Sequence, residues 1–301
     1  RKNIAIYKGV KQGIIMDRPA FRVELPDVLT TSVVVASPHS GRHYSWDFMQ
    51  STVLDERAVR SSEDAYVDML VAEAPAMGAP LLVAEFPRAY VDLNRAVDEL
   101  DPAVVEGVAR SNNNPRVSSG LGVIPRVVAN GRNIYRGKLD RAEADHRLDH
   151  VWRPYHNSLE ALLTQAQAQF GEAILLDMHS MPHEALDTVT RPGAPRPEVV
   201  LGDRFGASAK SEIIDLLEAA FQDAGLVVSR NSPFAGAFVT QHYGRPSRNR
   251  HAVQIEMDRS LYMNESLIRP NSNFQAMKTL VTEVLSKAIA ASSGRMPLAA
   301  E

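Results

Sequence analysis

The chain has 301 residues, with 33 Lys and Arg against 36 Asp and Glu, and it contains no cysteine. The net charge of −3 argues against a nucleic-acid-binding protein, because such proteins carry a strong basic excess. The lack of cysteine excludes disulfides, thiolate metal sites and a cysteine nucleophile, so any metal must be bound by His, Asp or Glu. No apolar stretch reaches the roughly 18 residues of a membrane span, and no apolar signal core is seen, so we expect a soluble, cytoplasmic protein.

Short aliphatic runs alternate along the chain with longer segments whose apolar residues recur every three or four positions. The short runs are typical of buried strands, and the longer segments are typical of helices. Two segments with little periodicity, 98–135 and 182–202, are expected to be long loops, either near a site or mobile at the surface. In chain order we predict a strand at 31–36, a helix at 63–77, a strand at 80–85, a helix at 150–170, a strand at 173–177, a helix at 207–224, strands at 226–229 and 252–257, and a helix at 273–291.

This alternation predicts a three-layer α/β fold, with a mostly parallel or mixed central sheet and helices on both faces. No repeat and no linker divides the sequence, so we expect a single domain over 1–301. Sheets of this kind bind ligands at the carboxyl ends of their strands. The residues that follow each predicted strand are therefore the candidates for a functional site.

A histidine follows each of two predicted strands. The first strand runs into His39, and the third leads to His179. Two imidazoles at strand ends favour a metal site, since neutral imidazole is a common metal ligand. Asp177 can accept a hydrogen bond from an imidazole N–H and so set which ring nitrogen faces the metal, although a role as a loop cap is equally open.

A carboxylate is the expected third ligand, because a catalytic zinc site typically has three protein ligands and keeps a fourth position for water. Glu63 and Asp64 stand at the predicted start of helix 63–77, soon after His39, and are the best candidates. Their alternative role is to complement the helix dipole, which is the commoner one for acids at that position.

Polar donors follow the second predicted strand. Arg88, Asn94 and Arg95 form a group suited to carboxylates, because a guanidinium binds both carboxylate oxygens at once, and they predict an anionic substrate. One arginine can instead stabilise the oxyanion of a scissile carbonyl. Surface salt bridges with Asp92 and Asp98 are the alternative.

The last predicted strand carries Glu256 within an apolar run. Burial there would raise its pKa towards the range of a general base, whereas strand alternation can instead turn it to solvent. His251, with His242 and Tyr243 upstream, belongs to a segment whose glycines and proline are typical of an active-site flap. The alternative is that these side chains are ordinary surface residues.

Together these segments resemble the N-formylglutamate amidohydrolases, a family similar in turn to the aspartoacylases and the zinc carboxypeptidases. The resemblance extends from about residue 30 to residue 265, and its pieces occur in matching order. The pieces are PHSGR at 38–42, SEDAYVD at 62–68, RAYVDLNR at 88–95, LLDMHSMP at 175–182, NSPFAGAFVTQHYG at 231–244 and HAVQIEMDRSLYM at 251–263.

The resemblance implies a carboxypeptidase-like α/β fold and one zinc ion per chain. It implies hydrolysis of N-formyl-L-glutamate, a small anionic amino-acid derivative, to formate and L-glutamate, the last step of one route of histidine breakdown. By the same resemblance, His39, Asp64 and His179 are the zinc ligands, with Asp64 favoured over Glu63, Glu256 is the base and proton shuttle, Arg88 is the oxyanion donor, and Asn94 and Arg95 bind a substrate carboxylate. We also expect His251 to contact the substrate.

One departure affects the third ligand. Aspartoacylases and carboxypeptidases place a ligand Glu three residues after the first His, where this chain has Arg42. The carboxylate must then come from elsewhere in the chain. Two other hypotheses are hydrolysis of another N-acyl amino acid or peptide C-terminus, and non-catalytic binding of acidic metabolites; the second is disfavoured because Glu256 and both histidines are present.

Overall fold

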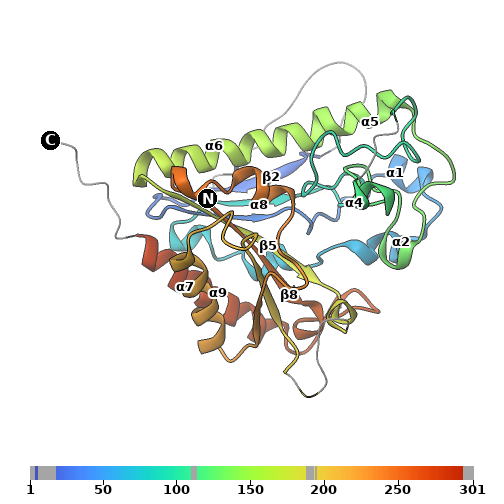
Figure 1. Ribbon diagram of the computed structural model, residues 1–301. Helices are drawn as coiled ribbons and strands as arrows, with labels where there is room; N and C mark the ends of the chain where they lie inside the picture. Colours follow the sequence, from blue (N-terminus) through green and yellow to red (C-terminus); the bar gives the residue numbers. More distant parts are fainter. Residues whose placement is uncertain (1–3, 6–17, 110–113, 188–192, 194, 294–301) are drawn as a thin grey trace.

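The computed structural model describes residues 4–5, 18–109, 114–187, 193 and 195–293. Its centre is an eight-stranded sheet with the strand order β1-β2-β4-β3-β5-β8-β6-β7 (Figure 1). The strands are β1 (Ile4–Ala5), β2 (Phe21–Glu24), β3 (Val33–Ser37), β4 (Leu81–Ala84), β5 (Ala173–Met181), β6 (Val199–Gly202), β7 (Val228–Arg230) and β8 (Arg250–Asp258).

The four central strands, β4, β3, β5 and β8, run parallel to one another. On one side β2 pairs antiparallel with β4, and on the other side β6 pairs antiparallel with β8 and parallel with β7. The sheet is therefore mixed. The longest ladder joins β5 and β8 over nine residues each, from Ala173 opposite Arg250 to Met181 opposite Asp258. Because these strands share one direction, their carboxyl ends meet at one edge of the sheet.

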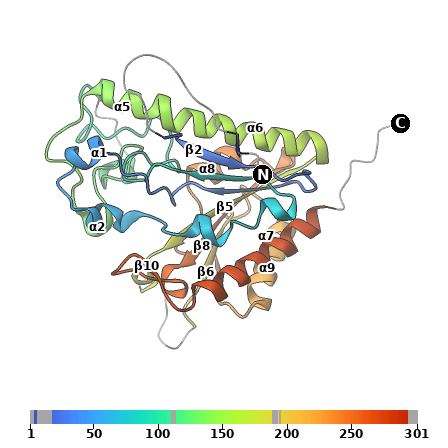
Figure 2. The same ribbon diagram turned by 180° about the vertical axis from the view of Figure 1, so that it is seen from behind.

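Helices cover both faces of the sheet (Figures 1 and 2). The helices α5 (Arg141–Arg147) and α6 (Arg153–Phe170), joined by a π-helical turn at Leu148–Trp152, pack on one face. The other face carries α7 (Ser211–Asp223) and α9 (Phe274–Ser292). The shorter elements are α1 (Trp46–Ser51), α2 (Glu56–Val59), α3 (Val67–Leu70), α4 (Pro115–Ser118), α8 (Phe238–Tyr243) and the β9 (Met263–Asn264) and β10 (Arg269–Pro270) pair, with 3₁₀ turns at Arg60–Ser62, Pro75–Met77, Ala129–Gly131, His183–Leu186, Pro246–Arg248 and Arg259–Leu261.

Alternate side chains of the buried strands fill two separate cores. In β3, Val34 packs in the core under α6, whereas Val33 and Val35 pack in the core under α7 and α9. Successive side chains of a strand point to opposite faces, so a strand covered on both faces is apolar throughout. This confirms the expected three-layer fold with a mixed sheet. Within the described part of the chain, no helix combines the length and hydropathy needed to cross a bilayer.

The prediction of a long helix at 63–77 is wrong. The structure has the four-residue helix α3 and a 3₁₀ turn at Pro75–Met77 there, and α3 is preceded by a residue, Tyr66, with a left-handed backbone (φ 67°). Asp64 is held outside any helix, because its N–H donates to the carbonyl of His39 over 3.0 Å. The loop expected at 182–202 ends in a buried strand, β6, whose four residues are too short a run to stand out among the prolines.

Candidate active site

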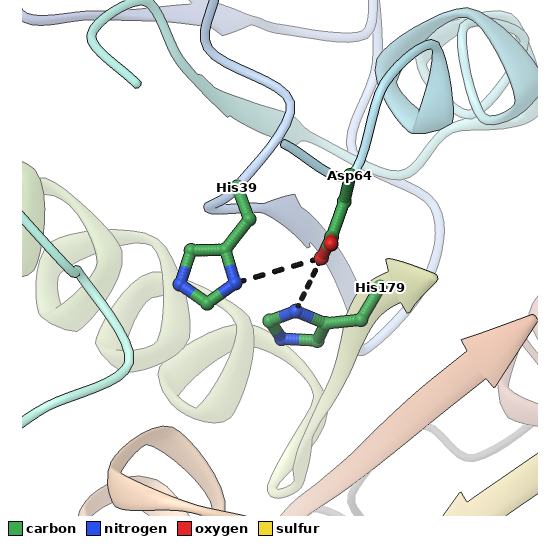
Figure 3. A group of neighbouring side chains, drawn as sticks. All are labelled: His39, Asp64 and His179. Atoms are coloured by element: carbon green, nitrogen blue, oxygen red, sulfur yellow. Dashed lines mark hydrogen bonds and ion pairs between the residues drawn. The ribbon is translucent and has the colours of Figure 1, made fainter. Parts of the chain in front are cut away.

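Three predicted metal ligands come together at the carboxyl edge of the sheet. His39 follows β3, His179 lies near the end of β5, and Asp64 lies in the segment before α3 (Figure 3). Asp64 Oδ2 is 3.1 Å from His179 Nδ1 and 3.5 Å from His39 Nδ1. Ligand atoms of all three residues lie within 4.8 Å of one another, and the three side chains are buried. The hydrogen bond from the Asp64 N–H to the His39 carbonyl brings the third residue to the two strand ends.

The far side of each imidazole faces a second buried carboxylate. His39 Nε2 is 2.7 Å from Asp92 Oδ1, and His179 Nε2 is 2.9 Å from Asp177 Oδ2. Asp92 accepts a hydrogen bond from His39 Nε2 and so leaves Nδ1 of this ring free to bind a metal. Asp177 lies at ion-pair distance from His179, without a hydrogen bond to it. Asp177 therefore faces an imidazole, which was one of its two expected roles. Asp92, expected only as a surface ion-pair partner, was missed as a residue of the site.

Two acids were candidates for the third ligand, and the structure separates them. Glu63 accepts hydrogen bonds from Arg60 Nε (3.0 Å) and from the Tyr44 hydroxyl (3.1 Å). Asp64 instead faces the histidines through Oδ2, while its Oδ1 accepts a hydrogen bond of 2.9 Å from Arg259 Nη2. The role of Arg259 was not expected, because only the folded chain brings the residue after β8 to the segment before α3.

Charges around Asp64 favour its ionised form. Burial alone would raise its pKa, but His179, His39 and Arg259 together hold the pKa of this carboxyl well below its usual range. Burial likewise opposes the charge on His179, but Asp177 and Asp64 raise the pKa of this imidazole. An acid that stays ionised beside two imidazoles is the electrostatic condition for binding a cation.

The donor set fits a divalent metal ion. His39 Nδ1 is buried and makes no hydrogen bond, which is costly unless another group binds it. Two imidazole nitrogens and one carboxylate oxygen are a common protein ligand set for catalytic zinc. Among the residues that the structure describes, this is the one group of three or more His, Asp or Glu residues arranged to bind an ion.

The turn after His39 has no space for a side chain at Gly41. A Cβ atom there would lie 2.1 Å from the carbonyl oxygen of Phe86. We therefore expect Gly41→Ala to lower the free energy of unfolding by about 1–3 kcal/mol, the usual cost of overpacking, as measured by urea denaturation. Gly137→Ala is the matched control, because nothing lies within 4 Å of its Cβ position. Equal stability of the two variants would contradict the expected clash.

A cavity of about 580 Å³ opens beside the three ligand residues. Side chains from four adjacent parallel strands and their ends line it: His39, Arg88, Arg95, His179 and Glu256. Further parts of the wall come from residues between 116 and 131, within the expected loop 98–135, and from segment 233–237 before α8. The expectation that loop 98–135 lies near a site is thus met.

Arg88 and Glu256 line the cavity together with His39 and His179, two of the three candidate ligand residues. Arg88 Nη2 donates to Asp92 Oδ2 (2.8 Å), and Nη1 is 3.9 Å from Asp64 Oδ1. Glu256 is 8% exposed, which excludes the solvent-facing alternative, and its Oε1 accepts a 2.8 Å hydrogen bond from Gln254 Nε2. Burial raises the pKa of Glu256, although the nearby His179 and Arg88 act in the opposite direction.

Asn94 and Arg95 both line the cavity, but they are engaged differently. The Asn94 amide donates to Gln254 Oε1 (3.1 Å) and accepts from the Val239 N–H (2.8 Å). Its side chain therefore connects β8 to α8 rather than standing free for a ligand. The Arg95 guanidinium donates to two carbonyl oxygens, of Leu121 (2.8 Å) and of Asn94 (2.7 Å), and has no carboxylate partner among the described residues.

His251 does not fit the expected contact with a substrate. It pairs with Ile174 near the start of β5, whereas Glu256 pairs with His179 near the end of that strand. Five residues of strand separate the two positions by about 16 Å. His251 is buried, its Nε2 lies 3.3 Å from Glu172 Oε2, and it is not among the residues that line the cavity. The prediction was wrong because both residues lie on β8, His251 near the start of this strand and Glu256 near the end where the cavity lies.

Comparisons with known proteins agree with this arrangement. The profile of the N-formylglutamate amidohydrolase family matches residues 31–263. The N-formylglutamate deformylases of Pseudomonas aeruginosa and Pseudomonas putida are 31% and 29% identical to this chain over 241 residues, covering 77% and 78% of it and 82% of each relative.

Solved structures show the same similarity. The crystal structure of N-formylglutamate amidohydrolase from Ralstonia eutropha is 34% identical, covers 91% of this chain and 98% of its own, and superposes with a TM-score of 0.85. A gene product of Agrobacterium tumefaciens, 20% identical over 91% of this chain and 96% of its own, shares the fold with a TM-score of 0.59. The chain therefore belongs to the N-formylglutamate amidohydrolase family.

Proposed function

We propose that this chain is a zinc-dependent amidohydrolase that cleaves N-formyl-L-glutamate to formate and L-glutamate, and that it serves in histidine breakdown. The observation that carries the proposal is the buried group of His39, Asp64 and His179 beside a cavity that also presents Arg88 and Glu256. The names of its relatives supply the substrate.

His39 Nδ1, His179 Nδ1 and Asp64 Oδ2 would hold the zinc ion. When bound, zinc lowers the pKa of water and polarises a carbonyl group. The protein prepares this site in two ways. Asp92 and Asp177 orient the imidazoles, and Arg259 engages one oxygen of Asp64 so that the other faces the two rings.

Glu256 is the proposed base and proton shuttle. Its buried carboxylate accepts the proton of the water that attacks the formyl carbon, and then delivers it to the departing amine of glutamate. A raised pKa suits this role, because a stronger base accepts a proton more readily near neutral pH. The hydrogen bond from Gln254 fixes Oε1 of Glu256 and thereby sets the direction in which Oε2 points.

Arg88 is the proposed oxyanion donor. Its ion pair with Asp92 holds the guanidinium at the cavity wall, beside the ligand residues. Loss of one such donor typically costs about 2.7–4 kcal/mol of transition-state stabilisation. Arg95 is the proposed partner of a substrate carboxylate. Asn94 positions the Arg95 guanidinium, since the backbone carbonyl of Asn94 accepts a hydrogen bond from Arg95 Nη1.

The test combines metal analysis with product detection. We expect the purified protein to hold zinc at one ion per chain and to release formate from N-formyl-L-glutamate. Formyl, acetyl and succinyl derivatives of one amino acid, assayed side by side, decide whether the formyl group is the preferred acyl group. A zinc-loaded protein that releases no formate would reject this function. Preferred release of acetate or succinate would show that the protein is a deacylase for another acyl group.

A further inference from the structure

Two arginines that line the cavity have no carboxylate partner among the described residues. The first is Arg95, which is buried and whose hydrogen bonds go to carbonyl oxygens alone. A buried guanidinium is normally paired, because burying an isolated charge costs free energy. Burial lowers the pKa of Arg95, and the charges of Arg88 and Arg116 lower it further, whereas Asp92 and Glu99 act in the opposite direction.

The second is Arg116 of α4, which is exposed and lines the same cavity. Its side chain makes no ion pair with any described acid, and its charge further lowers the pKa of Arg95. The other two arginines of the cavity differ, because Arg88 is paired with Asp92 and Arg259 is paired with Asp64. The unpaired positive charge is therefore confined to Arg95 and Arg116.

Nearby acids do not neutralise this pair. Asp92 and Glu99 both favour the charged form of Arg95. Asp92 is, however, paired with His39 and Arg88. The oxygens of Glu99 accept hydrogen bonds from the Ala96 N–H and from Asn114 Nδ2, each over 3.0 Å. Asn114 is also the N-cap of α4 and accepts from the Arg116 N–H over 3.0 Å. The Glu99–Asn114 contact thus connects the segment after Arg95 to the start of α4, and it places the two guanidinium groups at one cavity.

We propose that Arg116 binds a second carboxylate of the substrate, so that the cavity selects N-acyl amino acids with acidic side chains. The inference rests on the proposed function, in which Arg95 binds one carboxylate. A substrate with two carboxylates compensates both guanidinium charges, whereas a substrate with one carboxylate leaves one of them uncompensated. Arg116 is thereby a specificity-determining residue, and it takes no part in the bond cleavage itself.

The test compares two substrates of nearly equal size, N-formyl-L-glutamate and N-formyl-L-glutamine, which differ in one carboxylate. We expect Arg116→Gln to lower kcat/KM for N-formyl-L-glutamate about 10- to 100-fold, mainly through KM, because a hydrogen bond to a charged group is lost. In the same variant, kcat/KM for N-formyl-L-glutamine should change less than about 3-fold. Arg116→Lys should retain part of the preference, since it keeps the charge but loses the planar fork.

Arg153→Gln is the matched control, because this exposed arginine pairs with Asp149 and does not line the cavity. Equal losses for both substrates in Arg116→Gln, or a wild-type protein that accepts both equally, would overturn the inference. Calorimetric binding of both compounds to Glu256→Gln, with and without Arg116→Gln, separates the two proposals. A wild-type protein that hydrolyses neither substrate rejects the proposed function. The inference is still supported if Glu256→Gln binds N-formyl-L-glutamate more tightly than N-formyl-L-glutamine and this difference disappears when Arg116→Gln is added.

Discussion

Replacing Glu256 with Gln is expected to lower kcat for N-formyl-L-glutamate by about 10²- to 10⁴-fold, the usual contribution of a general base. The carboxamide fills nearly the same volume, and its oxygen can still accept the hydrogen bond from Gln254 Nε2. It cannot take a proton from the attacking water. The kcat should therefore fall while zinc content, measured by elemental analysis, and the circular dichroism spectrum remain unchanged.

Glu172→Gln is the matched control for this experiment. Glu172 is another buried glutamate, but it precedes β5 at the opposite edge of the sheet and does not line the cavity. Its replacement should leave turnover near the wild-type value. If Glu256→Gln also kept nearly normal kcat, the base would have to be another residue.

Removal of one proposed ligand should abolish metal binding. In His179→Ala we expect zinc to fall from one ion per chain to nearly none, with loss of turnover, because two donors rarely hold zinc in a catalytic site. The measurement is elemental analysis after dialysis against a weak chelator, together with formate release. Full zinc occupancy in this variant would reject the assignment of His179.

The same measurement of zinc content, made on variants of Glu63 and of Asp64, decides which of these two acids is the third ligand. Asp64→Asn should lose zinc, because the amide carries no charge, whereas Glu63→Gln should keep it, since the Glu63 carboxylate is bound by Arg60 and Tyr44. Asp64→Asn also leaves Arg259 without its partner, so its folding is checked by circular dichroism before metal analysis. The opposite result would make Glu63 the ligand.

Much of the candidate site could be predicted because it stands at the ends of parallel strands. His39, His179 and Glu256 each lie at or near the end of an apolar run, and parallel strands carry their ends to one edge of the sheet. The same reasoning failed for His251, because an apolar strand does not reveal how far along it the cavity extends. Glu256 faces the cavity, whereas His251, five residues earlier, faces Glu172.

The sequence by itself determined the three-layer α/β fold with helices on both faces of the sheet, since strand and helix periodicities depend on local geometry. Only the tertiary structure decided which charges pair and which stay unpaired. Asp92 meets a histidine 53 positions away, and Arg259 meets an aspartate 195 positions away. Arg95 and Arg116 look like other arginines in the sequence, and only folding shows that no described carboxylate reaches them. Ion pairing depends on distances of a few ångströms between segments far apart along the chain, and such distances leave no local pattern of residues.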